Sequence, residues 1–385
     1  MLSVGDGARV PIWGCGALFS EVQAPRVAVQ GWLASRLVLV IVLLVVVWSN
    51  GWSLAQALTR WDVVHFIEVS QHGYTSLTQT AFFPGLPLLL AGFSLVGIPP
   101  VAAGVIISLV GSGMAAWALY RLAGGQVTGA VAVWVWSFAP MTVFTFVPYT
   151  EAIFSAFAFW SFWYAKRGRW GWAAGLAAAA CLFRVSGLFL IGALGLVALF
   201  GTRGVTWRRR LATTVWMVIP ALVIAAYVVY LRVSFGSWTT WFRAEDLGWA
   251  RHFDWPWNAV IQTLHTAGII GTSHYSTAVM FQWEIAAFVI GLAIAIWSFV
   301  RKKIPEGGWV LVQVVALSCQ VWLISVARTM LIWFPLFTTI GDIGSGQLPR
   351  GKNNLRRAVL VAVLGLEAFA LTWWATRFFC GAWAG

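Results

Sequence analysis

The residues most suited to chemistry in this chain are three ionisable side chains that follow its first long apolar stretch. Asp62, His65 and Glu68 are three residues apart, so a helix lying at a membrane surface would present all three on one face. A carboxylate at the edge of a low-dielectric layer is well placed to take a proton from a substrate hydroxyl, and we predict that Asp62 is a general base. The alternatives are an interfacial salt bridge between Asp62 and Arg60, and a solvated helix face for His65 and Glu68.

Two arginines are placed where an anionic ligand could bind. Arg184 separates two short apolar runs and Arg328 stands at the end of another, so each charge lies at the edge of an apolar interior and needs a partner. A guanidinium group matches phosphate oxygens in a bidentate way, so two of them facing one cavity indicate a phosphate-bearing ligand. The alternatives are an ion pair between Arg184 and Glu151, and snorkelling of Arg328 to lipid headgroups.

The composition places these residues in a membrane protein. The chain is 60% hydrophobic and 10% charged, with a mean hydropathy of +0.82, whereas a soluble globule needs far more polar surface. Several stretches reach the roughly 20 apolar residues that cross a bilayer. The net charge of +13 lies mainly in short loops, which fits the positive-inside rule better than binding to nucleic acid. The 4 cysteines lack metal-ligand spacing, so we expect neither a metal site nor a disulfide framework.

The basic loops also set the orientation, because all of them face the cytoplasm if the first span runs outward. We predict an all-α polytopic bundle of about 11 transmembrane helices forming a single integral membrane domain over 1–385. Its N-terminus at 1–33 is cytoplasmic, its first outer loop covers 52–100, and a long outer loop covers 235–279. The predicted spans are 34–51, 101–120, 128–147, 151–165, 171–183, 187–200, 211–232, 281–300, 309–325, 329–344 and 357–376.

The apolar segment 82–98 is the exception to this pattern. It is interrupted by Pro84 and Pro87, and a full crossing would invert every later basic cluster. We therefore expect amphipathic, interfacial or re-entrant helices on the outer side. The ionisable residues that this topology places outside or near the outer boundary are Arg60, Asp62, His65, Glu68, Glu151, Arg184, Arg243, Glu245, Asp246, Arg251 and Arg328. Their clustering predicts a site on the non-cytoplasmic face.

Several motifs, in order along the chain, resemble those of the PIG-V family, which comprises the second GPI mannosyltransferase and its bacterial relatives. The resemblance runs from Arg60 to Pro335 and departs from the family at Glu245-Asp246, where relatives tend to carry Gln. A second departure is Val185-Ser186, in place of Pro-Thr. The matching segments are Arg60-Trp61-Asp62, His72-Gly73-Tyr74, the run AFFPGLPLL at 81–89, Ala139-Pro140, Tyr149-Thr150-Glu151, the run LFRVSG at 182–187, Phe235-Gly236, Trp241-Phe242-Arg243-Ala244, and Ser325 with Arg328, Phe334 and Pro335.

The resemblance implies a GT-C glycosyltransferase with Asp62 as the catalytic base. Such an enzyme inverts the anomeric centre while moving mannose from polyprenyl-phosphate-mannose to a lipid or glycan acceptor, and it needs no metal or other cofactor. Its partners are membrane lipids and these two substrates, with no nucleic acid, and in a bacterium it lies in the plasma membrane. The residues expected at the donor phosphate are Arg184 and Arg328, and those expected to bind substrate are Arg60, His65, Glu68, Tyr149, Glu151 and Arg243.

A different functional class remains open on the residues alone. A transporter or flippase for an anionic lipid or a lipid-linked sugar would use Arg184 and Arg328 to bind its cargo without any covalent step. Replacing Asp62 with Asn separates the two classes, because only transfer of a sugar requires a base at that position. A non-catalytic scaffold would tolerate the loss of both Asp62 and Arg184.

Overall fold

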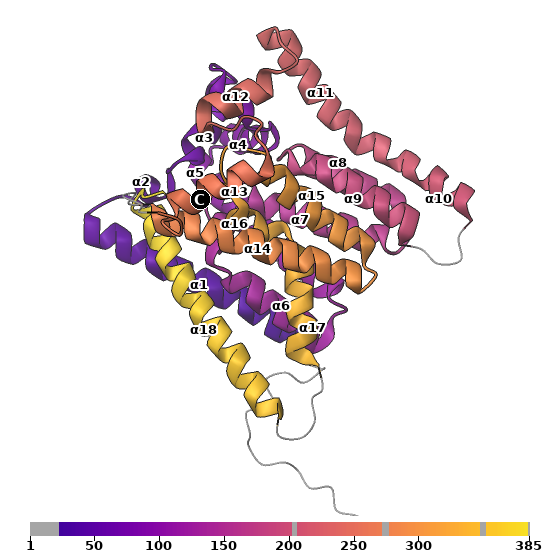
Figure 1. Ribbon diagram of the computed structural model, residues 1–385. Coiled ribbons are helices and arrows are strands. Elements are labelled where there is room, and N and C mark those ends of the chain that lie inside the picture. The colour runs from indigo at the N-terminus through magenta and orange to yellow at the C-terminus, as the bar shows by residue number, and fades with distance from the viewer. Residues whose placement is uncertain (1–22, 202–205, 272–276, 347–351, 384–385) are drawn as a thin grey trace, which may run out of the picture.

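The computed structural model describes residues 23–201, 206–271, 277–346 and 352–383, and these ranges contain helices and loops only (Figure 1). The α-helices are α1 (Ala24–Asn50), α2 (Leu54–Leu58), α3 (Asp62–His72), α4 (Gly85–Leu95), α5 (Pro100–Leu122), α6 (Gln126–Phe138), α7 (Glu151–Ala165), α8 (Trp170–Cys181), α9 (Ser186–Phe200), α10 (Trp207–Thr214), α11 (Val218–Phe235), α12 (Thr240–Trp249), α13 (Pro256–Thr266), α14 (Ala278–Val300), α15 (Ile304–Ser318), α16 (Val326–Thr329), α17 (Phe334–Ser345) and α18 (Lys352–Phe379). Short 3-10 helices are η2 (Thr78–Ala81), η3 (Pro140–Thr145), η4 (Val215–Met217) and η5 (Met330–Ile332).

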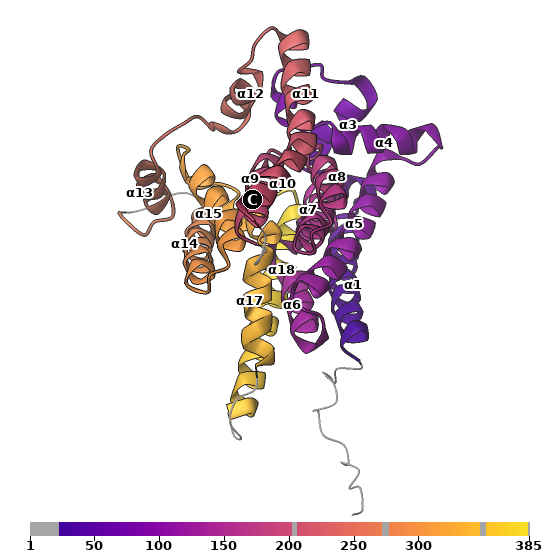
Figure 2. The ribbon, with the colours of Figure 1, turned by 90° about the vertical axis from the view of Figure 1, so that its right-hand side faces the viewer.

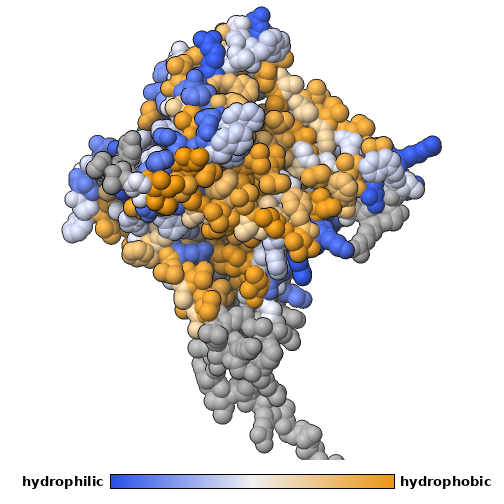
Figure 3. Space-filling view, viewed as in Figure 1, coloured by the Kyte–Doolittle hydropathy of each residue, from blue (hydrophilic) through white to orange (hydrophobic). Residues whose placement is uncertain are grey.

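The protein is a multi-pass integral membrane protein. Five of the described helical stretches are long and apolar enough to cross a bilayer: α1, α5, the continuous stretch 207–235, α14 and the 358–379 part of α18. The pair 326–332 and 334–345, bent by 68°, is a sixth if it forms one span. Hydrophobic side chains cover most of the middle of the face in Figure 3, while hydrophilic ones gather at its edges.

The remaining predicted spans coincide with shorter helices. These are α6, α7, α8, α9 and α15, which contain 13, 15, 12, 15 and 15 residues. At 1.5 Å per residue, such helices are shorter than the roughly 30 Å of a bilayer core. Every predicted span thus overlaps a helix or a bent pair, but the predicted span 128–147 runs past the end of α6 at Phe138, and the span 309–325 runs past the end of α15 at Ser318. The count of eleven crossings stays a prediction. The helix α1 begins at Ala24, ten residues before the predicted span, and the cytoplasmic placement of 1–33 stays a prediction.

The predicted first outer loop, 52–100, folds into short helices. Pro84 immediately precedes α4, which has only 11 residues and ends before Val96. A helix of that length extends about 16 Å, too short to cross the membrane alone. Figure 2 shows α4 lying across the direction of α5. The helix is therefore compatible with the expected re-entrant or interfacial element.

Two close backbone approaches position the residues at 149–151 and the apex that carries Arg184. On α5, a Cβ added at Gly104 would overlap the ring of Pro148, and one added at Gly111 would lie 2.9 Å from the amide nitrogen of Ile153. Ser108, between them, donates its hydroxyl to the carbonyl of Val147 at 2.6 Å. The close packing of α5 against this segment therefore fixes where α7 begins, and with it the side chains at 149–151.

The second approach joins α4 to the α8–α9 hairpin. The amide of Gly85 donates to the carbonyl oxygen of Leu182 at 2.7 Å. Leu182 begins the hairpin apex, and Arg184 follows two residues later. The apex that carries Arg184 is thus tied directly to the first outer loop, as a site shared by the two segments requires.

Candidate active site

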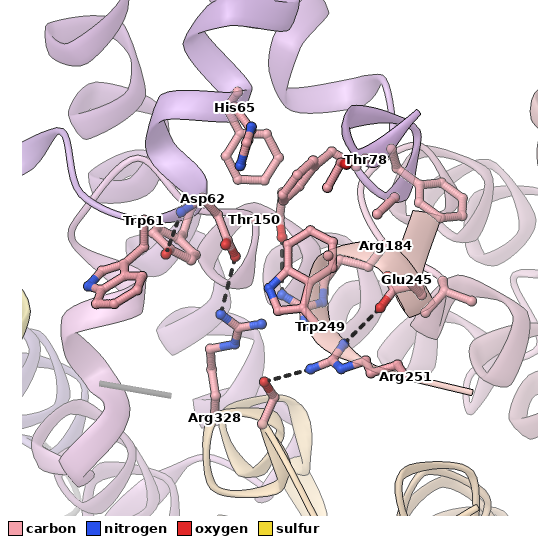
Figure 4. Close-up of a pocket in the computed structure, with 18 of the residues that line it drawn as sticks. Trp61, Asp62, His65, Thr78, Thr150, Arg184, Glu245, Trp249, Arg251 and Arg328 are labelled. Atoms are coloured by element: carbon pink, nitrogen blue, oxygen red, sulfur yellow. Dashed lines mark hydrogen bonds and ion pairs between the residues drawn. The ribbon is translucent and has the colours of Figure 1, made fainter. Parts of the chain in front are cut away.

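A cavity of about 410 Å³ opens among α3, η2, the start of α7, the α8–α9 apex, α12 and the turn before α16 (Figure 4). Aromatic rings form much of its wall, including Trp61, Phe82 and Trp249. Six of the predicted site residues meet there from four separate segments of the chain. They are Asp62, His65, Tyr149, Glu151, Arg184 and Arg328.

Asp62 is the first residue of α3 and points into this cavity (Figure 4). The preceding residue, Trp61, has φ +53°, a left-handed value that costs energy for a residue with a side chain. The amide of Asp62 donates to the hydroxyl of Tyr149 at 3.2 Å, and its carboxylate lies 3.5 Å from Nη1 of Arg328. The predicted alternative pairing with Arg60 was wrong, because the ionic partner of Asp62 is Arg328.

Glu151 joins the two predicted phosphate arginines. Its side chain is 1% exposed, and its Oε1 atom forms an ion pair with Arg184 and lies 3.1 Å from Nε of Arg328. Arg184 also donates to the hydroxyl of Thr150 at 3.1 Å. The alternative interpretation of Arg184, an ion pair with Glu151, is therefore present. Together with Asp62 these groups form a chain of two arginines and two carboxylates whose charges compensate one another.

The ring of Tyr149 packs beside Arg328, one of the two arginines of this charged cluster. The guanidinium carbon of Arg328 lies 5.7 Å from the centre of its ring and 5.3 Å from that of Phe144. Burial, and then the negative charge of Asp62, raise the pKa of Tyr149 well above its usual value. The phenol therefore stays neutral, and its oxygen accepts the Asp62 amide hydrogen at the strained turn.

A second charged group lines the cavity apart from Asp62. Nη1 of Arg251 lies 3.2 Å from Oε2 of Glu245, and Nη2 donates to the hydroxyl of Ser325 at 2.9 Å. Burial raises the pKa of Glu245, while the charge of Arg251 opposes that shift. The sequence placed Glu245 and Arg251 among the outer-face charges but did not identify them as site residues. Their only signal was a cluster of charges within an aromatic loop.

Glu284, near the N-terminal end of α14, fixes the turn that presents Arg328. Its two carboxylate oxygens accept the backbone amides of Ser325 at 2.9 Å and Ala327 at 3.0 Å. Ser325 has φ +62°, so this left-handed turn is held by the buried carboxylate. In the sequence Glu284 was visible only as an acid near the start of an apolar span.

Three predicted substrate-binding residues do not line the cavity. Arg60 lies over the ring of Trp52, with 4.6 Å between its guanidinium carbon and the ring centre. Glu68 accepts a hydrogen bond from the side-chain amide of Gln79 at 3.0 Å, and Arg243 is exposed on α12. His65 does line the cavity, where its ring stacks on Phe82 at 5.2 Å.

In the described part of the chain, no three His, Cys, Asp or Glu side chains are grouped as a metal site requires. The charged side chains of the cavity instead form three pairs of opposite sign, Asp62 with Arg328, Glu151 with Arg184, and Glu245 with Arg251. Such a site can accept a proton at a carboxylate and hold an anionic group at an arginine.

A third of the chain is homologous to curated mannosyltransferases. GPI alpha-1,6-mannosyltransferase 2 of Mus musculus is 36% identical over 151 residues, which cover 35% of this chain and 30% of the mouse protein. The proteins of the same name from Rattus norvegicus and Homo sapiens are 35% and 32% identical, over 36% and 35% of this chain and 31% and 30% of their own lengths. The match thus spans about a third of these relatives. No protein-family model matches the chain.

Among solved structures, the chain is similar to ArnT from Cupriavidus metallidurans bound to undecaprenyl phosphate, with 13% identity and a TM-score of 0.48 over 91% of this chain and 76% of that one. It is also similar to the oligosaccharyltransferase AglB from Archaeoglobus fulgidus in complex with an inhibitory peptide and a dolichol-phosphate. That similarity has 12% identity and a TM-score of 0.42, over 91% of this chain and 56% of the other.

Proposed function

We propose that this protein is an inverting glycosyltransferase that moves a mannosyl residue from polyprenyl-phosphate-mannose to a hydroxyl group of a lipid or glycan acceptor. The observation that carries the proposal is the Asp62 carboxylate, aimed into a cavity that three arginines also line. The partial homology to GPI alpha-1,6-mannosyltransferase 2 supports mannose as the sugar. The acceptor is left as a class, because the match covers only 30% of that relative.

The proposed reaction is a single displacement at the anomeric carbon. Asp62 accepts the proton of the acceptor hydroxyl while the oxygen forms its bond to the anomeric carbon. The bond from that carbon to the phosphate oxygen breaks, and the polyprenyl phosphate leaves with the bonding electrons. Arginines along the cavity, including Arg184 and Arg328, offset the negative charge that develops on the phosphate.

The proposed topology places this reaction on the non-cytoplasmic face. With the basic loops in the cytoplasm, the N-terminus is cytoplasmic and the cavity opens outward in a single domain of about eleven crossings. In a bacterium the membrane is the plasma membrane. Arg60, Glu68 and Arg243 are proposed to contact substrate outside the described cavity, and His65 is proposed to contact it within the cavity.

Transfer to a membrane acceptor tests the proposal. Purified protein is incubated with radiolabelled polyprenyl-phosphate-mannose and a membrane lipid extract, and the labelled product is identified by mass spectrometry. We expect label in a new glycolipid or glycan. Movement of intact labelled donor across proteoliposomes, with no covalent product, would instead establish a transporter.

A further inference from the structure

We propose that Arg251 and the hydroxyl of Ser325 form the subsite that holds the phosphate of the lipid-linked donor. The cavity's other arginines, Arg184 and Arg328, then position the two carboxylates, and Arg328 gains free positive charge only when Asp62 takes up the acceptor proton. This inference deepens the proposed function and rests on it for the identity of the donor. It assigns a binding role to a side chain that the sequence motifs leave without one.

Arg184 and Arg328 are already paired with carboxylates. Arg328 lies beside both Asp62 and Glu151, and Arg184 pairs with Glu151. Glu151 is 1% exposed, so it cannot turn to water if a phosphate takes its arginines. Because a buried charge without a partner is strongly unfavourable, these two arginines are held by the site itself.

An inverting reaction also requires the leaving phosphate to lie away from the base. The attacking oxygen and the leaving oxygen lie on opposite sides of the anomeric carbon, so the base and the leaving phosphate are separated by the sugar. Arg328 lies 3.5 Å from Asp62, on the side of the base. Figure 4 shows Arg251 apart from Asp62, with Glu245. Arg251 enters from the segment after α12, whereas Asp62 enters from α3.

Arg251 has hydrogen-bonding capacity left for a phosphate. Its side chain is 18% exposed, and its Nε atom is buried without a hydrogen-bond partner among the described residues. Its counter-ion, Glu245, is 12% exposed, and burial raises the pKa of that carboxyl. Uptake of one proton by Glu245 would therefore release Arg251 to a phosphate.

Ser325 completes the subsite. Its oxygen accepts from Nη2 of Arg251 at 2.9 Å, and its hydroxyl hydrogen can still be donated to a phosphate oxygen. The backbone of Ser325 is held in its left-handed conformation by Glu284, at 2.9 Å. The serine is thus presented by a rigid turn, which lowers the entropy that binding must overcome.

Binding of polyprenyl phosphate to the purified full chain tests the inference. We expect Arg251→Gln to weaken binding about tenfold to a hundredfold, as for the loss of a charged hydrogen-bonding group. Arg232→Gln is the matched control, because Arg232 is an exposed arginine on the outer end of α11, beside Trp238. Glu245→Gln should bind polyprenyl phosphate more tightly than the wild type, since it removes the competing carboxylate.

Parallel measurements with inorganic phosphate and with phosphatidylinositol vesicles identify the source of the phosphate. Loss of phosphatidylinositol binding alone in Arg251→Gln would overturn the assignment to the donor. Equal affinity of Arg251→Gln and Arg232→Gln for polyprenyl phosphate would contradict the assignment of the subsite to Arg251. The proposed function would still stand if the wild type transfers mannose. A wild type that neither binds polyprenyl phosphate nor transfers mannose defeats the proposed function itself. If Arg251→Gln does not fold, Glu245→Gln alone tests the subsite. An affinity of Glu245→Gln for polyprenyl phosphate equal to that of the wild type would then contradict the assignment.

Discussion

Replacing Gly85 with Ala should separate the first outer loop from the apex that carries Arg184. An added Cβ would lie 2.7 Å from the carbonyl oxygen of Leu182 and 2.9 Å from its carbonyl carbon. These are backbone atoms, so a side-chain rotation cannot relieve the overlap. Overpacking typically costs about 1–3 kcal/mol, and weakening the 2.7 Å hydrogen bond between the two backbones adds about 1 kcal/mol. We expect the free energy of unfolding to fall by about 2–4 kcal/mol.

The matched control for this change is Gly92→Ala in the same helix. A Cβ at Gly92 meets nothing within 4 Å, and Ala is favoured over Gly within a helix by about 0.5–1 kcal/mol. Unfolding of both variants is followed in detergent micelles, and mannosyl transfer is measured on the folded protein. Gly85→Ala should lose stability and also transfer, because the apex moves Arg184 away from Glu151. Equal stability and activity of the two variants would refute the reasoning.

Three further predictions concern the groups around the cavity. Glu284→Gln replaces one of the two carboxylate oxygens that accept the amides of Ser325 and Ala327 with an NH2 group, which donates. A buried amide left without an acceptor costs about 1–3 kcal/mol. We therefore expect kcat to fall at least about tenfold in steady-state assays, with little change in the KM for the acceptor. Tyr149→Phe removes the acceptor for the Asp62 amide and should likewise reduce kcat, with unchanged far-ultraviolet circular dichroism. Burial raises the pKa of Glu245, so its carboxylate takes up a proton at a higher pH than an exposed glutamate does. Protonation removes the counter-ion of Arg251, and we expect the affinity for the phosphodiester donor to rise as the pH falls. In Glu245→Gln the affinity should not vary over the same pH series, and a parallel rise in both proteins contradicts the assignment.

The sequence predicted the elements and one side of the cavity well. Apolar length located helices at every expected span, and Pro84 and Pro87 indicated that 82–98 does not cross the membrane in full, which the short helix α4 fits. Asp62, Glu151, Arg184 and Arg328 could be grouped because the predicted topology puts each of them at the end of an apolar run on one side of the membrane. Topology alone brings such residues to one face, so their convergence needs no knowledge of side-chain packing.

The side of the cavity that carries Arg251 and Ser325 could not be predicted, because it is formed by long-range contacts that the periodicity of the sequence does not reveal. Arg251 reaches Ser325 across 74 positions of the sequence, and Glu284 reaches the same turn across 41. Outside the cavity, Arg36 was also missed: it lies within α1, 5% exposed, where its Nη1 donates to the carbonyl and hydroxyl oxygens of Thr145 at 3.0 and 2.9 Å. The left-handed turn at Ser325 supplies the partner of Arg251 and of Glu284, and the end of the 3-10 helix η3 supplies the partner of Arg36, so the packed structure sets all three contacts.

The most direct test of the central claim compares the wild type with Asp62→Asn in two assays on the same purified protein. One assay measures mannosyl transfer from polyprenyl-phosphate-mannose, and the other measures binding of polyprenyl phosphate. If Asp62 is the base, transfer should fall by about 10²–10⁴-fold while the affinity for polyprenyl phosphate changes little. Transfer at the wild-type rate by Asp62→Asn would contradict the account.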